Sequence, residues 1–194
     1  MKKQILILAI LIFPMVLLYP QKAKPHTALV LIDIQAFYFD TTKMPLVGRE
    51  EAAQKAAEIL DYFRKNNMPV IHVRHEGGGD IRPEVSPVEG EKVIEKQQVN
   101  AFLGTDLLEY LRSMGITRLV LAGMQTHMCL EAATRAAADY GFHCTVISDA
   151  CATRDLTYGD KTIKAEDVHY STLATLEVYA KVMTAEEFLN AMTN

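Results

Sequence analysis

The sequence has few of the features that mark several large classes of protein. It contains only three cysteines, an odd number that excludes a fully paired disulfide framework. Its 20 basic and 24 acidic residues give a net charge of −4, so no basic excess points to nucleic acid. It has no internal repeat and no low-complexity segment. With 194 residues, 49% hydrophobic and 23% charged, the chain is predicted to be globular, with one main domain.

The amino terminus departs from this globular pattern. Lys2 and Lys3 precede an apolar run over residues 5–19, with Pro14 inside it. A basic start before an apolar stretch of about 15 residues is typical of a secretory signal, and a membrane span needs about 20. No small-x-small cleavage triplet follows, so an uncleaved anchor and a buried first element stay open as alternatives.

We therefore interpret residues 1–25 as a signal peptide or N-terminal anchor and residues 26–194 as the functional domain. We expect an exported protein, periplasmic or secreted, with no stable membrane span beyond that anchor. Three free thiols are unusual in an exported protein, because an oxidising compartment favours their oxidation.

Beyond the leader, apolar runs of strand length alternate with longer segments of helical period. The predicted strands cover residues 28–32, 70–73, 92–95, 119–122, 144–147 and 180–183. The predicted helices cover residues 49–66, 106–114, 128–140, 165–179 and 185–192. Strands that are apolar without alternation are buried on both faces, which favours a parallel sheet between helices. We predict an α/β fold, a three-layer α/β/α sandwich with a Rossmann-like parallel sheet and its site at the carboxyl ends of the strands.

Three ionisable residues stand at those strand ends. Asp33 follows the first strand, Lys96 the third, and Cys129 lies six residues beyond Gly123, which ends the fourth. Each alone has a simpler interpretation: an Asp that caps a turn, a solvated Lys, a buried and inert Cys. Because parallel strands end at the same edge, we expect the three side chains to meet there.

Together these groups suit nucleophilic catalysis. A thiol in the first turn of a helix is expected to have a lowered pKa, and the ammonium of Lys96 would lower it further. Asp33 could take the proton from Cys129 and later give it to a leaving group. Free N–H groups of the turn over residues 125–129 could hold an oxyanion. The arrangement predicts acyl transfer through a covalent thioester.

The segments that carry these residues resemble the signatures of the isochorismatase-like cysteine hydrolases. The similar segments are Leu-Ile-Asp-Ile-Gln-Ala-Phe at 31–37, Lys96 with Ala-Phe at 101–102, and Gly-Met-Gln-Thr-His-Met-Cys at 123–129. The resemblance implies a catalytic triad of Asp33, Lys96 and Cys129 and a six-stranded parallel sheet. It also implies a non-proline cis peptide between Met124 and Gln125, with the N–H groups of Gln125 and Cys129 as oxyanion donors.

Within this family the sequence favours a metal-independent amidohydrolase. Family members that cleave the vinyl ether of isochorismate lack the nucleophilic Cys, which this chain keeps. Nicotinamidases carry a metal site with an Asp-x-His pair, but residues 39–68 contain no His. The one Asp-x-His, Asp167 and His169, lies on a predicted helix where residues two apart diverge by about 200°. We expect no metal and no cofactor. The segment at 126–129 looks most like the streptothricin-hydrolase-like members, which open a cyclic amide.

Position in the chain gives five candidates for contact with a small-molecule substrate: Gln35, Phe37, Phe102, Thr126 and His127. His75 could line the pocket or be a loop histidine, and Tyr158 could act as a lid or simply be exposed. Cys144 and Cys151 are about 23 Å apart along an extended strand, too far for a disulfide.

Other functions stay open at this stage. A nicotinamidase-type or isochorismatase-type hydrolase is the alternative within the family. A thiol sensor would lack a resolving partner, since the chain has no Cys-x-x-Cys. A non-catalytic domain of the same fold is a further alternative. An apolar helix face left over from the sheet would support a homo-oligomer.

Overall fold

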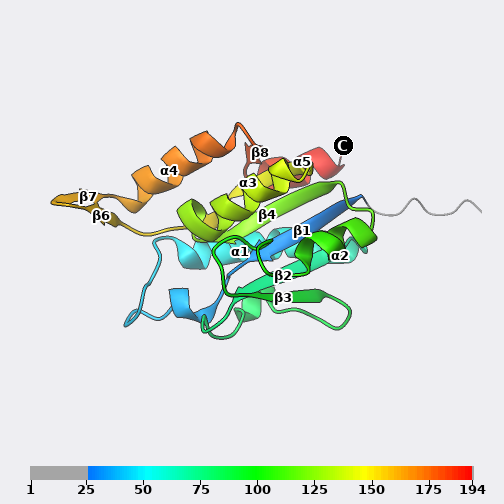
Figure 1. Ribbon diagram of the computed structural model, residues 1–194, viewed down its shortest axis with the longest axis horizontal. Helices are drawn as coiled ribbons and strands as arrows, with labels where there is room; N and C mark the ends of the chain where they lie inside the picture. The colour runs from blue at the N-terminus through cyan, green and yellow to red at the C-terminus, as the bar shows by residue number, and fades with distance from the viewer. Residues whose placement is uncertain (1–25, 194) are drawn as a thin grey trace, which may run out of the picture.

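A six-stranded parallel sheet forms the middle layer of the protein (Figure 1). The computed structural model describes residues 26–193. The strands are β1 (Thr27–Ile32), β2 (Val70–His75), β3 (Lys92–Lys96), β4 (Arg118–Met124), β5 (His143–Ala152) and β8 (Ala180–Met183). They lie in the order β3-β2-β1-β4-β5-β8. The chain builds the sheet outward from β1 to β3 and then crosses back to place β4 on the other side of β1. The predicted α/β sandwich is confirmed.

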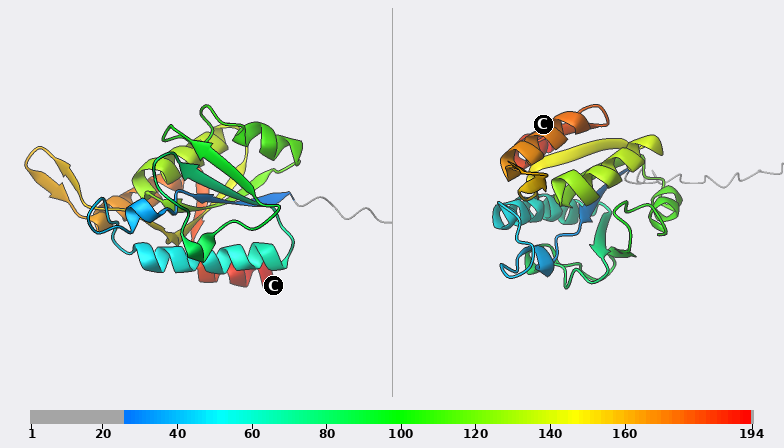
Figure 2. Two further views of the ribbon diagram at one scale, coloured as in Figure 1. Left: turned by 90° about the horizontal axis from the view of Figure 1, so that it is seen from below. Right: turned by 60° about the vertical axis from the view of Figure 1, so that its left-hand side comes forward.

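Helices cover both faces of the sheet. On one face lie α1 (Arg49–Lys65) and α5 (Ala185–Thr193), which run side by side in Figure 2. On the other lie α2 (Leu107–Ser113), α3 (Glu131–Asp139) and α4 (Ala165–Leu176). Each face has its own apolar core, because the strand side chains alternate between the two layers of helices.

The structure differs from the sequence prediction mainly where the chain leaves the sheet. The helix expected over 128–140 begins earlier, as a π-helix (Thr126–Leu130) that leads into α3. Strand β5 extends through Ala152, with a register irregularity against β4. A short antiparallel hairpin, β6 (Leu156–Tyr158) and β7 (Lys161–Ile163), was not predicted and projects from the body of the molecule (Figure 1). Tyr158 lies in this hairpin and is 83% exposed, which agrees with the interpretation of an exposed side chain.

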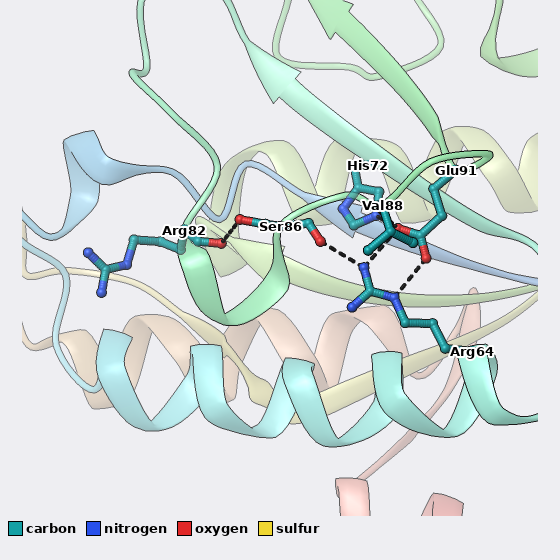
Figure 3. A network of polar contacts seen from close by, with 6 residues as sticks. All are labelled: Arg64, His72, Arg82, Ser86, Val88 and Glu91. Carbon is teal, nitrogen blue, oxygen red and sulfur yellow. Dashed lines mark hydrogen bonds and ion pairs between the residues drawn. The ribbon is translucent and has the colours of Figure 1, made fainter.

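The connection between β2 and β3, residues 76–91, is held against α1 by a partly buried charge network (Figure 3). Arg64 donates two hydrogen bonds to the Glu91 carboxylate, each 2.8 Å long, and a third to the Ser86 carbonyl. Glu91 also lies 2.8 Å from the Nε2 atom of His72 and accepts from the Val88 N–H. The network fixes a loop that begins directly at the carboxyl end of β2.

The approach of β1 to β4 depends on Gly123. This residue pairs with Ile32 in the parallel register and has a φ of 132°, which L side chains rarely adopt. A Cβ atom at this position would overlap the carbonyl oxygen of Ile32. Because Asp33 follows Ile32 and Cys129 follows Gly123, this contact sets the spacing of two candidate site residues.

The leader predicted for residues 1–25 lies outside the described residues. Within residues 26–193, no helix has both the length and the apolar character that crossing a bilayer would require. Export and the boundary at residue 25 stay predictions.

Substitution of Gly123→Ala should destabilise the fold by about 3 kcal/mol or more, since backbone of β1 must shift. Gly115→Ala is the matched control, because Gly115 also has a positive φ, 69°, but nothing lies within 4 Å of an added Cβ. The control should cost only about 1 kcal/mol. Urea unfolding of both variants measures the difference, and equal losses would contradict the steric argument.

Substitution of Glu91→Gln should cost about 2 kcal/mol at neutral pH, since the carboxylate receives several charge-assisted hydrogen bonds. Burial raises the pKa of Glu91, but the hydrogen bonds from Arg64, Val88 and His72 outweigh it and lower the pKa from 4.5 to about 2. A lowered pKa in the folded state stabilises the fold above the unfolded value. The difference between wild type and variant should therefore shrink as the pH falls from 4.5 towards 2. Urea unfolding across this range checks it, and a constant difference would rule out a charged Glu91.

Candidate active site

The carboxyl ends of three strands bring Asp33, Lys96 and Cys129 together. The Lys96 Nζ lies 2.8 Å from Asp33 Oδ2 and 3.3 Å from Cys129 Sγ. All three are buried, with exposed fractions of 0%, 1% and 4% respectively. The structure thus places in one cluster the three residues that the sequence singled out as a triad.

Local backbone structure aims each of these side chains. Asp33 adopts a left-handed conformation with φ of 50°, and its N–H donates to the Val73 carbonyl at 2.9 Å, which fixes it at the end of β1. Cys129 lies in the π-helix, where the Gln125 carbonyl accepts from the N–H groups of Met128 and Leu130. The peptide bond before Gln125 is cis, as the family resemblance implied.

The electrostatics of the cluster differ from the sequence expectation. Burial and the Asp33 carboxylate together raise the pKa of the Cys129 thiol to about 12, and the ammonium of Lys96 only partly offsets them. Burial also raises the pKa of Asp33, against the opposing effect of Lys96. The expectation of a lowered thiol pKa is therefore wrong for the resting protein. The sequence showed the helix and the lysine, but not how deeply the thiol is buried beside a carboxylate.

Asp33 is a suitable proton acceptor. Beyond its ion pair with Lys96, its Oδ1 atom is buried and has no hydrogen-bond partner within residues 26–193. One Oδ atom of Asp33 lies within 4.8 Å of Cys129 Sγ. An unpaired carboxylate oxygen close to a protonated thiol can take its proton when a substrate arrives.

His75 is a fourth member of the cluster that the sequence left undecided. Its Nδ1 atom lies 2.9 Å from Lys96 Nζ. Residues 75 and 96 are partners in the register of β2 and β3, which puts their side chains at the same level of the sheet edge. The register was the missing signal, because β2 lies between the strands that carry Asp33 and Lys96.

The donor atoms do not fit a metal ion. Asp33, His75 and Cys129 offer ligand atoms that all lie within 4.8 Å of one another. However, Lys96 Nζ lies within 3.3 Å of an atom of each, so a positive charge already fills the space among them. The pair Asp167 and His169 does not converge either: Asp167 is exposed, while His169 Nδ1 lies 3.0 Å from Thr126 Oγ1.

A cavity of about 210 Å³ adjoins the cluster. It is lined by Gln35, Phe37, Tyr38 and His75, together with residues 76–78. Burial raises the pKa of the Tyr38 phenol to about 12, so this hydroxyl stays protonated. Of the five residues predicted to contact substrate, Gln35 and Phe37 line this cavity.

The other three predicted contacts take different positions. Phe102 is buried and packs against the rings of Tyr140 and Phe142. Thr126 is fully buried beneath His169. His127 is half-buried, with Nδ1 2.6 Å from Thr153 Oγ1. Thr126 and His127 belong to the π-helix and therefore anchor the turn that carries Cys129.

The remaining cysteines are chemically quiet. Cys129, Cys144 and Cys151 are all unpaired and buried, so the prediction that Cys144 and Cys151 form no disulfide is confirmed. Burial raises the pKa of Cys144 and of Cys151 to about 12. Their Sγ atoms contact backbone carbonyls, whereas Cys129 Sγ lies 3.3 Å from Lys96 Nζ.

Comparison with known proteins gives one consistent result. A family model described as an isochorismatase domain matches residues 27–187. An uncharacterized isochorismatase family protein of Bacillus subtilis, YddQ, is 45% identical over 177 residues, which are 84% of this chain and 98% of that protein. The crystal structure of a putative isochorismatase hydrolase from Oleispira antarctica superposes with a TM-score of 0.83 at 42% identity, covering 88% of this chain and 99% of that one.

Two more distant relatives have names that state an activity. A maleamate amidohydrolase of Pseudomonas putida is 31% identical over 155 residues, which are 66% of this chain and 72% of that enzyme. A streptothricin hydrolase of Streptomyces noursei is 25% identical over 144 residues, 69% of this chain and 57% of that enzyme.

Replacement of Asp33→Asn should lower the pKa of the Cys129 thiol. The carboxylate that disfavours the thiolate would be gone, while the ammonium of Lys96 would remain. The rate of Cys129 alkylation by iodoacetamide, followed by mass spectrometry from about pH 6 to about pH 11, should then rise at a lower pH than in wild type. Asp160→Asn, at the exposed tip of the hairpin, is the control and should leave the profile unchanged. An unshifted profile in the Asp33 variant would mean that Asp33 does not control this thiol.

Proposed function

We propose that this chain, which belongs to the isochorismatase family, is a hydrolase that cleaves a carbon–nitrogen amide bond of a small molecule. The reaction would proceed through a thioester on Cys129. The observation that carries the proposal is the contact of Lys96 with both Asp33 and Cys129 in a buried cluster. A nucleophile, a proton acceptor and a compensating charge are the three parts that amide acyl transfer requires. The names of two relatives, an amidohydrolase and a streptothricin hydrolase, agree with this class of reaction.

The first half of the reaction forms the thioester. The thiol is protonated at rest, since its pKa is raised to about 12, so the nucleophile must be generated as the substrate binds. Asp33 takes the thiol proton while Sγ attacks the amide carbonyl carbon. The resulting oxyanion would be held by the backbone N–H groups of Gln125 and Cys129. Collapse breaks the carbon–nitrogen bond, and Asp33 gives its proton to the departing amine.

The second half restores the enzyme. A water molecule gives a proton to Asp33 and attacks the thioester carbonyl, and the carbon–sulfur bond breaks. The acid product leaves, and the proton on Asp33 returns to Sγ. Throughout, Lys96 keeps one positive charge beside a site that would otherwise hold only negative or neutral groups, which stabilises each anionic step. The sum of the two halves is one amide and one water converted to one acid and one amine.

We expect a small substrate. The cavity beside the cluster measures about 210 Å³, below the range of about 300–1,000 Å³ that is usual for drug-sized ligands. Aromatic rings and a protonated phenol form part of its wall, which suits a compact, largely uncharged acyl group.

We expect the protein to release ammonia or an amine from members of a panel of small linear and cyclic amides. Cys129→Ala should lower turnover by about 10⁴-fold or more, since it removes the nucleophile. Cys144→Ala is the matched control, because this thiol is buried in the core without a charged side-chain partner, and it should retain activity. Prior treatment with EDTA should leave the rate unchanged.

The panel has outcomes that count against the proposal. Equal rates for wild type and Cys129→Ala would exclude the thioester mechanism. Loss of activity on chelation would favour the nicotinamidase-type alternative. Vinyl-ether cleavage of isochorismate without amide turnover would favour the isochorismatase type. No turnover of any amide by a folded wild-type protein would favour a thiol sensor or a non-catalytic domain.

A further inference from the structure

The contact between His75 and Lys96 gives the histidine a function of its own. We infer that His75 selects substrates whose acyl part carries a neutral hydrogen-bond acceptor, by donating its Nε2–H into the cavity while Nδ1 holds Lys96. The inference rests on the proposed amide hydrolysis and specifies which amides the site prefers.

The charge state of Lys96 fixes the tautomer of His75. An ammonium can only donate hydrogen bonds, so the Nδ1 atom 2.9 Å away must accept one. A neutral imidazole that accepts at Nδ1 carries its proton on Nε2. Lys96 has three protons and three neighbouring acceptors, namely Asp33, Cys129 and His75, so all of its donors are used. His75 is thereby set as a hydrogen-bond donor through Nε2.

The Nε2–H group is free to meet a ligand. His75 lines the cavity, and no hydrogen-bond partner for its Nε2 is present within residues 26–193. Nε2 is also not one of the buried polar atoms that lack a partner, so it is open to the cavity or to solvent. His75 is half-buried, and one of its ring nitrogens lies within 4.8 Å of Cys129 Sγ, so a substrate on Cys129 would lie close to this imidazole.

Gln35 holds the backbone of His75 in place. The Gln35 side chain accepts from the His75 N–H at 2.7 Å and donates to the His75 carbonyl at 3.1 Å and to the Gly79 carbonyl at 2.8 Å. A Cβ atom at Gly78 would come within 2.6 Å of the Gln35 amide, so the loop packs closely on this clamp. Because every polar atom of Gln35 is used in this way, His75 rather than Gln35 supplies the free donor on this wall.

The charges around the cavity favour a neutral acceptor over an anionic one. Glu76 lies at its rim and is exposed, and its carboxylate accepts from the Gln97 amide at 2.7 Å. Lys43, whose Nζ lies 5.9 Å from the centre of the Phe37 ring, is paired with Asp40 at 3.5 Å. Glu76 thus places a negative charge at the rim that would repel a carboxylate, whereas a ketone oxygen or a ring nitrogen can accept from Nε2 without that cost.

Two substrates and two variants separate the roles of the two ring nitrogens. The substrates are 4-oxopentanamide and pentanamide, which differ only in a ketone oxygen remote from the amide. His75→Asn can keep an acceptor near the Nδ1 position for Lys96 but has nothing at Nε2. His75→Gln can place a donor near Nε2 but loses the acceptor for Lys96. His143→Asn is the control, since His143 is exposed at the opposite end of the sheet.

In wild type, kcat/KM should favour 4-oxopentanamide by about tenfold, the value of one hydrogen bond of this kind. His75→Asn should reduce this preference to near unity, mainly through a higher KM for the ketone. His75→Gln should lower kcat for both substrates, since Lys96 loses a partner, yet keep part of the preference. The control should behave as wild type does.

Two results would overturn the inference: an undiminished ketone preference in His75→Asn, or equal kinetics of wild type on the two substrates. A parallel measurement keeps its failure distinct from failure of the proposed function. Protection of Cys129 from iodoacetamide by the two amides reports binding without any need for turnover. Preferential protection by 4-oxopentanamide that disappears in His75→Asn would support recognition by His75 even if neither amide is hydrolysed, whereas equal or absent protection by both would count against it.

Discussion

The buried ion pair between Lys96 and Asp33 is the interaction on which the rest of the site depends. Both side chains are within 1% of full burial, and an isolated charge at such a position would cost several kcal/mol. Burial of the pair is tolerated because Lys96 has an acceptor for each of its three protons. Two of those acceptors, Cys129 and His75, are the groups that would meet the substrate. Under the proposed mechanism, the same contacts that make the charge tolerable would also define the nucleophile and the tautomer of the histidine.

The order of the strands explains why four separate segments can meet around one ammonium. Lys96 ends β3 and must reach past the end of β2 to contact Asp33 at the end of β1. The register of β2 and β3 places His75 on that path. Across the sheet, the absence of a side chain at Gly123 lets β4 approach β1 closely, which brings the π-helix and Cys129 to the other side of the carboxylate. The ion pair, the register and the glycine are thus parts of one geometric solution.

The sequence predicted the layers and the triad because both depend on local patterns. Each of the six strands of the sheet has an apolar segment that the sequence identified, and Asp33, Lys96 and Cys129 follow or end three of them. The motifs around these residues led to the family that the comparison then showed. The position of His75 at the Lys96 level could not be predicted, because it depends on the pairing register of two strands. The π-helix and the hairpin β6–β7 were missed because such short segments give no clear periodic signal.

The raised thiol pKa also bears on the conflict between the predicted export and three unpaired cysteines. Oxidation and disulfide exchange proceed through the thiolate, and solvent access speeds both. In this fold all three thiols are buried, and the pKa of each is raised to about 12, so very little thiolate exists at neutral pH. A nucleophile that loses its proton to Asp33 only when a substrate carbonyl is in place would be protected between turnovers. Free cysteines are therefore compatible with an oxidising compartment in this protein, because burial keeps the thiols away from oxidants.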